Sequence, residues 1–414
     1  MGRILEAVLP ARLGTPFRWL VGSSWTSNLG DGIGLAAGPL LVASQTQDPF
    51  LVALGALLQH LPWLLFGLYA GVLADRVDRR VLVIAVNLVR AAVLAVLTVA
   101  LLTGQVTIVV VLVAMLLLGT AEVFADTTTS TLLPMVVPRA DLGVGNARLM
   151  TGFITTNQLV GPAVGAALFA AGMAWPFLTQ ALCVALGAVL VSRMQLPAVS
   201  RSAGRSHLRR DLVQGFSWTW GNAPVRTLTL TIVTFNVTYG AAWSVLVLYA
   251  TQRLGLGAVG FGLLTTVGAA GGIAGTAVYD WLERHASLAA IMRVGLLIET
   301  FTHLGLALTT VGWVAMVILF VFGMHAFIWG TTSRTVRMRA VPSELQGRVG
   351  SLYLIGVYGG IVVGQGLGGV IARSWGVTGP FWFAFAGSAV LLALIWRELG
   401  HIAHADEEIR DLAP

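Results

Sequence analysis

The sequence predicts an all-α membrane protein with twelve transmembrane helices in two pseudo-twofold-related bundles of six. Three observations lead to this prediction. Hydrophobic residues make up 57% of the 414 residues and charged residues only 10%, too few charges to cover a soluble protein of this length. Apolar runs long enough to cross a bilayer recur along the whole chain. Residues that lie at the ends of apolar runs in the first half also recur about 204 positions later.

Twelve apolar runs alternate with short polar turns. We expect helices at approximately 18–44, 50–74, 81–102, 106–131, 143–171, 176–194, 224–252, 258–281, 287–309, 313–337, 347–374 and 378–398. Many of the 49 glycines fall inside these runs, where small residues let membrane helices approach one another closely. The runs therefore predict closely packed helices in lipid.

The charged turns predict the orientation. Arginines cluster before the first run and after the even-numbered runs, whereas the opposite turns carry almost none except Arg253 and Arg373. This positive-inside pattern places both termini in the cytoplasm. No lysine occurs, so all 25 basic residues are arginine, which is typical of a GC-rich bacterial genome. We expect a multi-pass protein of the bacterial inner (plasma) membrane.

The two halves of the chain repeat each other. The recurring pairs are Gly71 and Gly275, Asp75 and Asp280, and the Val-Pro dipeptides at 137–138 and 341–342, which are 204, 205 and 204 residues apart. Duplication about an axis along the membrane normal explains such an offset. We expect an N-terminal six-helix bundle at 1–194, a cytoplasmic linker at 195–223, a C-terminal six-helix bundle at 224–400 and an acidic cytoplasmic tail at 401–414. A short amphipathic helix on the membrane surface is expected near 208–220 of the linker.

A short basic turn joins the second and third runs. It reads Gly71-Val-Leu-Ala-Asp75-Arg-Val-Asp78-Arg79-Arg80. This resembles the cytoplasmic signature loop of the major facilitator superfamily, Gly-x-x-x-Asp-Arg-x-Gly-Arg-Arg, with Asp78 where the family usually has glycine. A turn that only sets topology would explain the arginines but not Gly71 or Asp75.

The resemblance implies that this loop ties the two halves together in one state of a transport cycle. Asp75 would then face the positive end of a helix in the other half, and Arg79 would join an acidic partner such as Asp126. The expected gating residues are Gly71, Asp75, Arg79, Arg80, Arg90 and Arg348.

Asp31 lies near the middle of the first run, where a charge costs about 2.5–3.5 kcal/mol on insertion scales. Asn28 shares its helical face, and the repeat pairs Asp31 with Asn236 of the seventh run. The resemblance implies that these two helices line a central cavity, so we expect Asp31 to couple transport to protons. The alternative is a structural hydrogen-bond anchor between helices.

Glu122 and Asp126 lie four residues apart on one face of the fourth run. Two carboxylates this close repel each other when both are ionised, which suits proton exchange. The alternative is a structural network in which Arg90 neutralises one acid and Arg79 the other. We therefore expect proton coupling to involve Asp31, Glu122 and Asp126.

Other polar and aromatic side chains inside the runs are candidates for a substrate cavity. They are Asn28, Gln59, Asn157, Asn236, Tyr239, Trp243 and His325. Any one of them can instead bond a neighbouring helix. Glu299 and His303 share a face in the ninth run, which the resemblance makes peripheral, so we expect that pair to support packing.

Three further stretches resemble the drug- and siderophore-exporter branch of the superfamily, with its macrolide and enterobactin efflux relatives. They are Asn28-Leu-Gly-Asp-Gly-Ile, the stretch from Gly119 to Pro138, and Val341-Pro-Ser-Glu-Leu-Gln-Gly-Arg-Val. The resemblance implies a secondary active transporter that exports an amphipathic drug, siderophore or secondary metabolite by proton antiport and alternating access. A lipid flippase, a small-nutrient importer and a non-transporting receptor remain as alternatives.

No enzyme signature competes with this interpretation. The sequence has no Walker loop, no His-Glu-x-x-His pair and no Gly-x-Ser-x-Gly elbow, so we expect no enzyme, metal site or cofactor. The expected partners are membrane lipids, a small-molecule substrate and protons, with no nucleic acid, and we expect a monomer.

Overall fold

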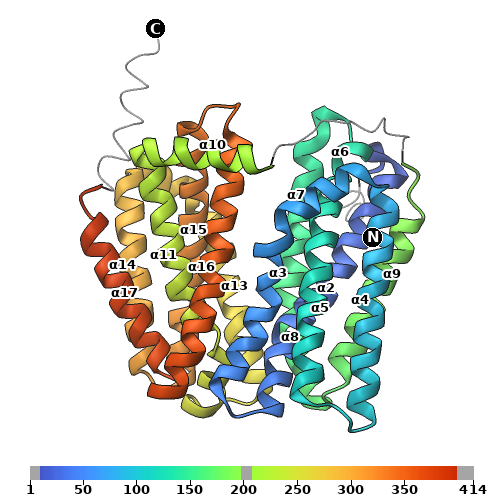
Figure 1. The fold of residues 1–414 in the computed structure, drawn as a ribbon, viewed down its shortest axis with the longest axis horizontal. Helices are drawn as coiled ribbons and strands as arrows, with labels where there is room; N and C mark the ends of the chain where they lie inside the picture. Colours follow the sequence, from blue (N-terminus) through green and yellow to red (C-terminus); the bar gives the residue numbers. More distant parts are fainter. Residues whose placement is uncertain (1–9, 197–207, 399–414) are drawn as a thin grey trace. The chain divides into compact units, whose positions relative to one another are not determined.

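The computed structural model describes residues 10–196 and 208–398 of the chain (Figure 1). These residues form helices and no strand. The elements are η1 (Ala11–Leu13), α2 (Gly14–Gln45), α3 (Pro49–Arg76), α4 (Arg79–Leu102), α5 (Ile108–Ser130), α6 (Leu133–Val136), η2 (Arg139–Asp141), α7 (Leu142–Gly152), η3 (Phe153–Val160), α8 (Gly161–Ala171), α9 (Trp175–Ser192), α10 (Leu208–Gly221), α11 (Ala223–Trp243), α12 (Leu246–Leu248), η4 (Tyr249–Arg253), α13 (Ala258–His285), α14 (Leu288–Leu308), α15 (Gly312–Ala340), α16 (Gln346–Trp375) and α17 (Gly379–Ile395).

The twelve expected runs are all helical, with ends within a few residues of the predicted ones. The fifth run continues through α7, the π-helical segment η3 and α8, and the seventh bends by 42° between α11 and the α12–η4 segment. Nine helices of the described ranges are long and apolar enough to cross a membrane, or ten if the bent pair is one span. Of the other two runs, α17 has only 17 residues and α2 carries a carboxylate and several hydroxyls. Twelve membrane spans therefore stay a prediction.

The helices group into two compact units. Unit 1 covers the described residues of Met1–Gln47, Leu58–Gly204 and Gly257–Thr266; unit 2 covers those of Asp48–Leu57, Arg205–Leu256 and Val267–Pro414. The first residues of α3 thus group with unit 2, and those of α13 with unit 1. The sequential division at 194 and 224 stays a prediction. The linker at 197–207 and the tail at 401–414 lie outside the described residues, whereas α10 confirms a helix near 208–220.

Each unit packs its helices in the same order. In unit 1, α2 packs on α8 and α9, while α4 packs on α9 and α5. In unit 2, α11 packs on α16 and α17, while α14 packs on α17 and α15. Counted along the expected twelve helices, these are the same four pairs, which is the packing that a duplicated sequence predicts.

A pair of glycines 204 residues apart shows the repeat at atomic detail. Gly119 of α5 lies against the backbone of Gln59 in α3, and Gly323 of α15 lies against the backbone of Gly268 in α13. Neither position has room for a Cβ atom. Close approach of two membrane helices requires small residues at the crossing, so both glycines are needed for packing.

The surface of the helices is apolar. Large apolar side chains such as Val96 of α4, Val109 of α5 and Leu394 of α17 are more than half exposed. Exposed apolar area on this scale is costly in water but not in lipid. The fold is therefore that of a multi-span membrane protein.

Candidate functional site

Asp31 and Arg90 form a buried ion pair between α2 and α4 in unit 1. Arg90 Nη2 donates to Asp31 Oδ1, and the two side chains are 3% and 11% exposed, respectively. Arg90 Nη1 also donates to Asn87 Oδ1 at 3.3 Å. A buried arginine keeps its charge and therefore needs a carboxylate beside it. In the alternative drawn from the sequence, Arg90 neutralises one acid of α5; its direct partner is Asp31, and α2 and α4 both pack on α9.

Gln180 of α9 is a further member of this site. It is 7% exposed, and its side chain interacts with the Asp31 carboxylate. The Gln180 amide lies beside Gly34, one turn further along α2, where a Cβ atom would come within 2.9 Å of Gln180 Nε2. Gln180 was not among the site residues predicted from the sequence. Its one signal was an amide inside an otherwise apolar run.

Glu122 and Asp126 lie on the same face of α5, as predicted. Both interact electrostatically with Asp31 and Arg90, so the three acids and the arginine form one cluster. Within residues 10–196 and 208–398, neither α5 carboxylate has a hydrogen bond or an ion pair. Glu122 is half-buried and Asp126 is exposed. We name Asp31, Arg90, Glu122 and Asp126 the unit 1 cluster.

The unit 1 cluster is electrically unbalanced. It holds one permanent cation and three acids, so it carries two excess negative charges when every acid is ionised. Charge in an apolar surrounding is costly unless it is compensated. Protons, or a cationic group on a bound molecule, would compensate it, and the two would then compete for the same carboxylates.

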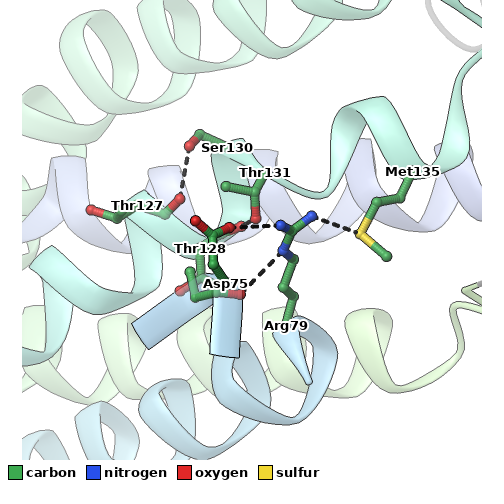
Figure 2. Close-up of polar contacts among 8 residues, drawn as sticks. Asp75, Arg79, Thr127, Thr128, Ser130, Thr131 and Met135 are labelled. Carbon is green, nitrogen blue, oxygen red and sulfur yellow. Dashed lines mark hydrogen bonds and ion pairs between the residues drawn. The ribbon is translucent and has the colours of Figure 1, made fainter. Parts of the chain in front are cut away.

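The signature loop makes a local ion pair (Figure 2). Arg79 Nη2 donates to Asp75 Oδ1 at 2.9 Å, Nε donates to the Ala74 carbonyl at 3.2 Å, and Nη1 lies 3.4 Å from Met135 Sδ of α6. We expected Arg79 to reach Asp126, but its ion pair is with Asp75, across the break between α3 and α4. The hydroxyls at the end of α5 lie beside this pair in Figure 2.

Two neighbours of that pair fix the loop. Asp78, where the family usually has glycine, is the N-cap of α4: its Oδ1 accepts from the Val81 amide at 3.1 Å. Arg80 donates to the Ser192 carbonyl at the end of α9. By contrast, a Cβ atom on Gly71 would meet nothing within 4 Å in the described structure.

The last expected gating residue, Arg348, lies in unit 2. Its Nε donates to Asp211 Oδ1 at 2.8 Å, which ties the start of α16 to α10. Gly215 of α10 packs directly on the Arg348 backbone. This contact fixes α10 on unit 2. A gating role for Arg348 stays a prediction.

The three cavity candidates of unit 1 bond mostly within their own helices. Asn28 Nδ2 donates to the Ser24 carbonyl at 2.8 Å, one turn before Asp31. Asn157 is buried in the π-helical segment η3 and accepts from Gln158 Nε2 at 2.9 Å. Gln59 is half-buried at the α3–α5 crossing. Their role in a cavity stays a prediction.

The candidates of unit 2 gather around α11. Asn236 is buried and donates to the Ile232 carbonyl at 2.7 Å. The rings of Tyr239 and Trp243 lie 4.5 Å apart between centroids and are tilted by 31°, and both contact Phe322 of α15. Half-buried aromatic rings of this kind form a surface on which a flat or cationic molecule can rest.

His325, a candidate for the substrate cavity, belongs to a buried group with Glu299 and His303. His303 Nε2 lies 2.9 Å from Glu299 Oε1, and His325 Nε2 lies 3.7 Å from Glu299 Oε2. The i, i+4 spacing of Glu299 and His303 predicted that they share a face. Nothing in the sequence indicated that His325 of the next helix joins them. Among the described residues, no group of three or more His, Cys, Asp or Glu side chains is arranged to hold a metal ion.

Comparisons with known proteins agree with this fold. The profile of the transmembrane secretion effector family matches residues 8–411. The multidrug efflux pump Tap of Mycolicibacterium fortuitum is 26% identical over 393 residues, which are 92% of each chain.

Solved structures of transporters share the architecture at low sequence identity. A crystal structure of the nucleoside transporter NupG superposes with a TM-score of 0.76 at 10% identity, covering 93% of this chain and 100% of that one. A bacterial homologue of the iron transporter ferroportin, in its inward-facing state, gives 0.73 at 14% identity, covering 93% and 98%. These likenesses are to transporters and not to a class of enzymes.

Proposed function

We propose that this chain, which belongs to the transmembrane secretion effector family of the major facilitator superfamily, exports an amphipathic small molecule in exchange for protons. The family and the similarity to Tap support a transporter. The direction, the driving ion and the class of cargo are our proposal. The observation that carries it is the unit 1 cluster, in which one buried arginine faces three acids inside apolar helices.

The cluster would couple the two fluxes by competition. When Asp31 is ionised it compensates Arg90, and the remaining acids can accept a cationic cargo. When a proton neutralises Asp31, Arg90 must find its compensation at Glu122 or Asp126, which leaves one acid fewer for the cargo. Since burying an uncompensated charge is costly, proton and cargo would not bind well together, which is the condition for antiport.

Alternating access would follow from the same competition. Release of Asp31 from Arg90 changes the contact between α2 and α4, two helices that both pack on α9. The Asp75–Arg79 pair lies at the turn into α4 and is exposed enough to break and re-form. We propose that this pair, with Arg80, acts as the switch that follows the proton.

We further propose that the protein works as a monomer in the bacterial plasma membrane with both termini cytoplasmic. It would take lipophilic cargo, such as a drug, siderophore or secondary metabolite, against the aromatic face of α11. Protons, membrane lipids and this cargo would be its partners, with no nucleic acid.

The test is transport by the purified protein in liposomes under an imposed proton gradient. Ethidium, a tetracycline, a macrolide and a ferric siderophore serve as probes. We expect the acid-to-neutral pH gradient to drive at least one probe to a higher concentration on one side of the membrane. A protonophore should abolish this accumulation. Asp280→Asn, an exposed carboxylate outside the cluster, serves as the matched control for Asp31→Asn.

The outcomes separate the candidate functions. Concentration of a probe that persists without the gradient would refute proton coupling. Movement of a fluorescent phospholipid without any small probe would favour a flippase. Binding of probes without any flux would favour a receptor.

A further inference from the structure

A second group of titratable side chains is buried in unit 2, and the mechanism above does not use it. Glu299, His303 and His325 are 1%, 0% and 3% exposed, respectively. Glu299 and His303 come from α14 and His325 from α15, two helices that pack on each other. One carboxylate therefore lies between two imidazoles, at 2.9 Å and 3.7 Å.

The hydrogen bonds of this group are incomplete. Glu299 Oε2, His303 Nδ1 and His325 Nε2 are buried without a hydrogen-bond partner in the described structure. A group that served only to hold α14 against α15 would be expected to satisfy its polar atoms, since unmet buried polar groups oppose folding. The vacant acceptor on Glu299 and the vacant ring nitrogen of His325 face each other across 3.7 Å.

No arginine of the described residues interacts with this carboxylate. The groups that interact electrostatically with Glu299 are His303, His325 and Tyr239 of α11. The α17 helix, which packs on α14, contains no titratable residue. The charged side chains of α13 come only in its last turns, at 280–285. The charge of this group is therefore set by its own protons, unlike that of the unit 1 cluster.

The group lies directly behind the aromatic face of α11. The ring of His303 meets Trp243 edge-on at 6.0 Å, and the ring of His325 meets Phe322 at 6.3 Å. Trp243, Phe322 and Tyr239 in turn contact one another. An imidazolium attracts an aromatic ring more strongly than a neutral imidazole does, so protonation changes the packing of this face.

We propose that Glu299, His303 and His325 form a second proton-carrying site, whose occupancy changes the aromatic face on which cargo rests. The inference builds on the proton antiport proposed above and adds a site in the other unit. With Glu299 ionised and both imidazoles neutral, the group carries one negative charge. One added proton on His325 makes it neutral, and Nε2–H then donates to Glu299 Oε2 as the two atoms approach.

The proposal has a direct consequence for the count of bound protons. The wild-type protein in nanodiscs should take up protons on acidification beyond those taken up by Glu299→Gln, because the glutamine can neither titrate nor stabilise an imidazolium. A pH-sensitive dye in weakly buffered solution measures the difference. His285→Gln, which removes an exposed histidine of α13, is the control for simple loss of a histidine.

Transport distinguishes a proton carrier from a structural pair. We expect Glu299→Gln to lower the gradient-driven concentration ratio of ethidium by roughly fivefold or more, while gradient-free exchange of ethidium continues. His325→Gln should act in the same direction and shift the pH profile of transport, because it removes the acceptor of the added proton. Glu299→Asp, which keeps the carboxylate, should restore part of the coupling if Glu299→Gln folds poorly.

An unchanged proton count together with unchanged coupling in Glu299→Gln would overturn the inference. Equal loss of driven and gradient-free exchange in Glu299→Gln and His325→Gln, with no change in proton count, would also overturn it in favour of a structural pair. If wild-type protein concentrates no probe on a proton gradient, the proposed function fails instead. The proton count still decides the inference in that case.

Discussion

The two units pack alike but carry polar clusters of opposite kinds. In unit 1, Arg90 supplies a charge that no physiological pH removes, and three carboxylates surround it. In unit 2, Glu299 lies between two histidines, and no arginine is among the described groups that interact with it. The first cluster can trade a proton for another cation, but its arginine stays charged. In the second group, every charge depends on bound protons.

This difference shows which features of the two duplicated halves stayed alike and which diverged. The packing glycines Gly119 and Gly323 occupy equivalent positions, 204 residues apart. At the same offset, Arg90 corresponds to Val294 and Glu122 to Ala326. Helix packing therefore constrains both halves equally, whereas the ionisable groups diverged after duplication. We infer that the units have different tasks in one cycle.

The largest expected effect comes from breaking the Asp31–Arg90 pair. Asp31→Asn leaves Arg90 buried without its direct partner, and losing one member of a buried pair costs about 3–5 kcal/mol. We expect lower thermal stability in detergent and no gradient-driven transport. Asp31→Asn combined with Arg90→Gln removes both charges and should recover stability but not coupling.

Those two variants separate folding from mechanism. Recovery of coupling in the double variant would exclude the unit 1 cluster from proton transport. Unchanged stability in Asp31→Asn would mean that Glu122 or Asp126 already compensates Arg90. The two units would then not differ in how their buried charge is compensated in the way described above.

The fold was accessible from the sequence because apolar length and loop charge are local signals. The twelve runs, the helical segment near 208–220 and the 204-residue offset need no knowledge of which helix faces touch. Predicting the ion pairs between helices did require knowing which helix faces touch. Arg90 lies near Asp31 only because α2 and α4 share α9 as a neighbour, and His325 meets Glu299 only through the α14–α15 contact. Spacing alone predicted contacts within one helix, such as Glu299 with His303.

A second test concerns what the units share. Gly119→Ala and Gly323→Ala each place a Cβ atom against the backbone of a neighbouring helix. Such overpacking typically costs about 1–3 kcal/mol, and we expect similar losses of thermal stability in both variants. Gly71→Ala, where the added atom meets nothing, is the matched control. A large loss in one unit and none in the other would contradict equivalent packing.

Helix capping provides a smaller test of the same equivalence. Asp78 caps α4, and Ser287 caps α14 by accepting from the Ala290 amide at 3.2 Å. Removing such a cap costs about 1 kcal/mol, so Asp78→Ala and Ser287→Ala should lower stability by similar amounts. Asp78→Gly restores the residue usual in the family and should cost only a few tenths of a kcal/mol. Equal losses for Asp78→Ala and Asp78→Gly would show that the carboxylate is not acting as a cap.

The smallest effect on stability, and the sharpest contrast in function, is expected at the two turns that follow α3 and α13. Arg79 pairs with Asp75 through an exposed contact, and Arg284 donates to the carbonyl of Asp280 at 3.0 Å. Exposed arginine contacts contribute at most about 1 kcal/mol, so Arg79→Ala and Arg284→Ala should unfold at nearly the same temperature as wild type. Arg79→Ala should nevertheless slow transport at saturating probe, because it removes the proposed switch, while Arg284→Ala leaves the rate unchanged. Stopped-flow ethidium transport in liposomes measures both. Equal slowing by the two variants would assign the effect to lost positive charge at the membrane surface, and equal rates would remove Arg79 from the switch.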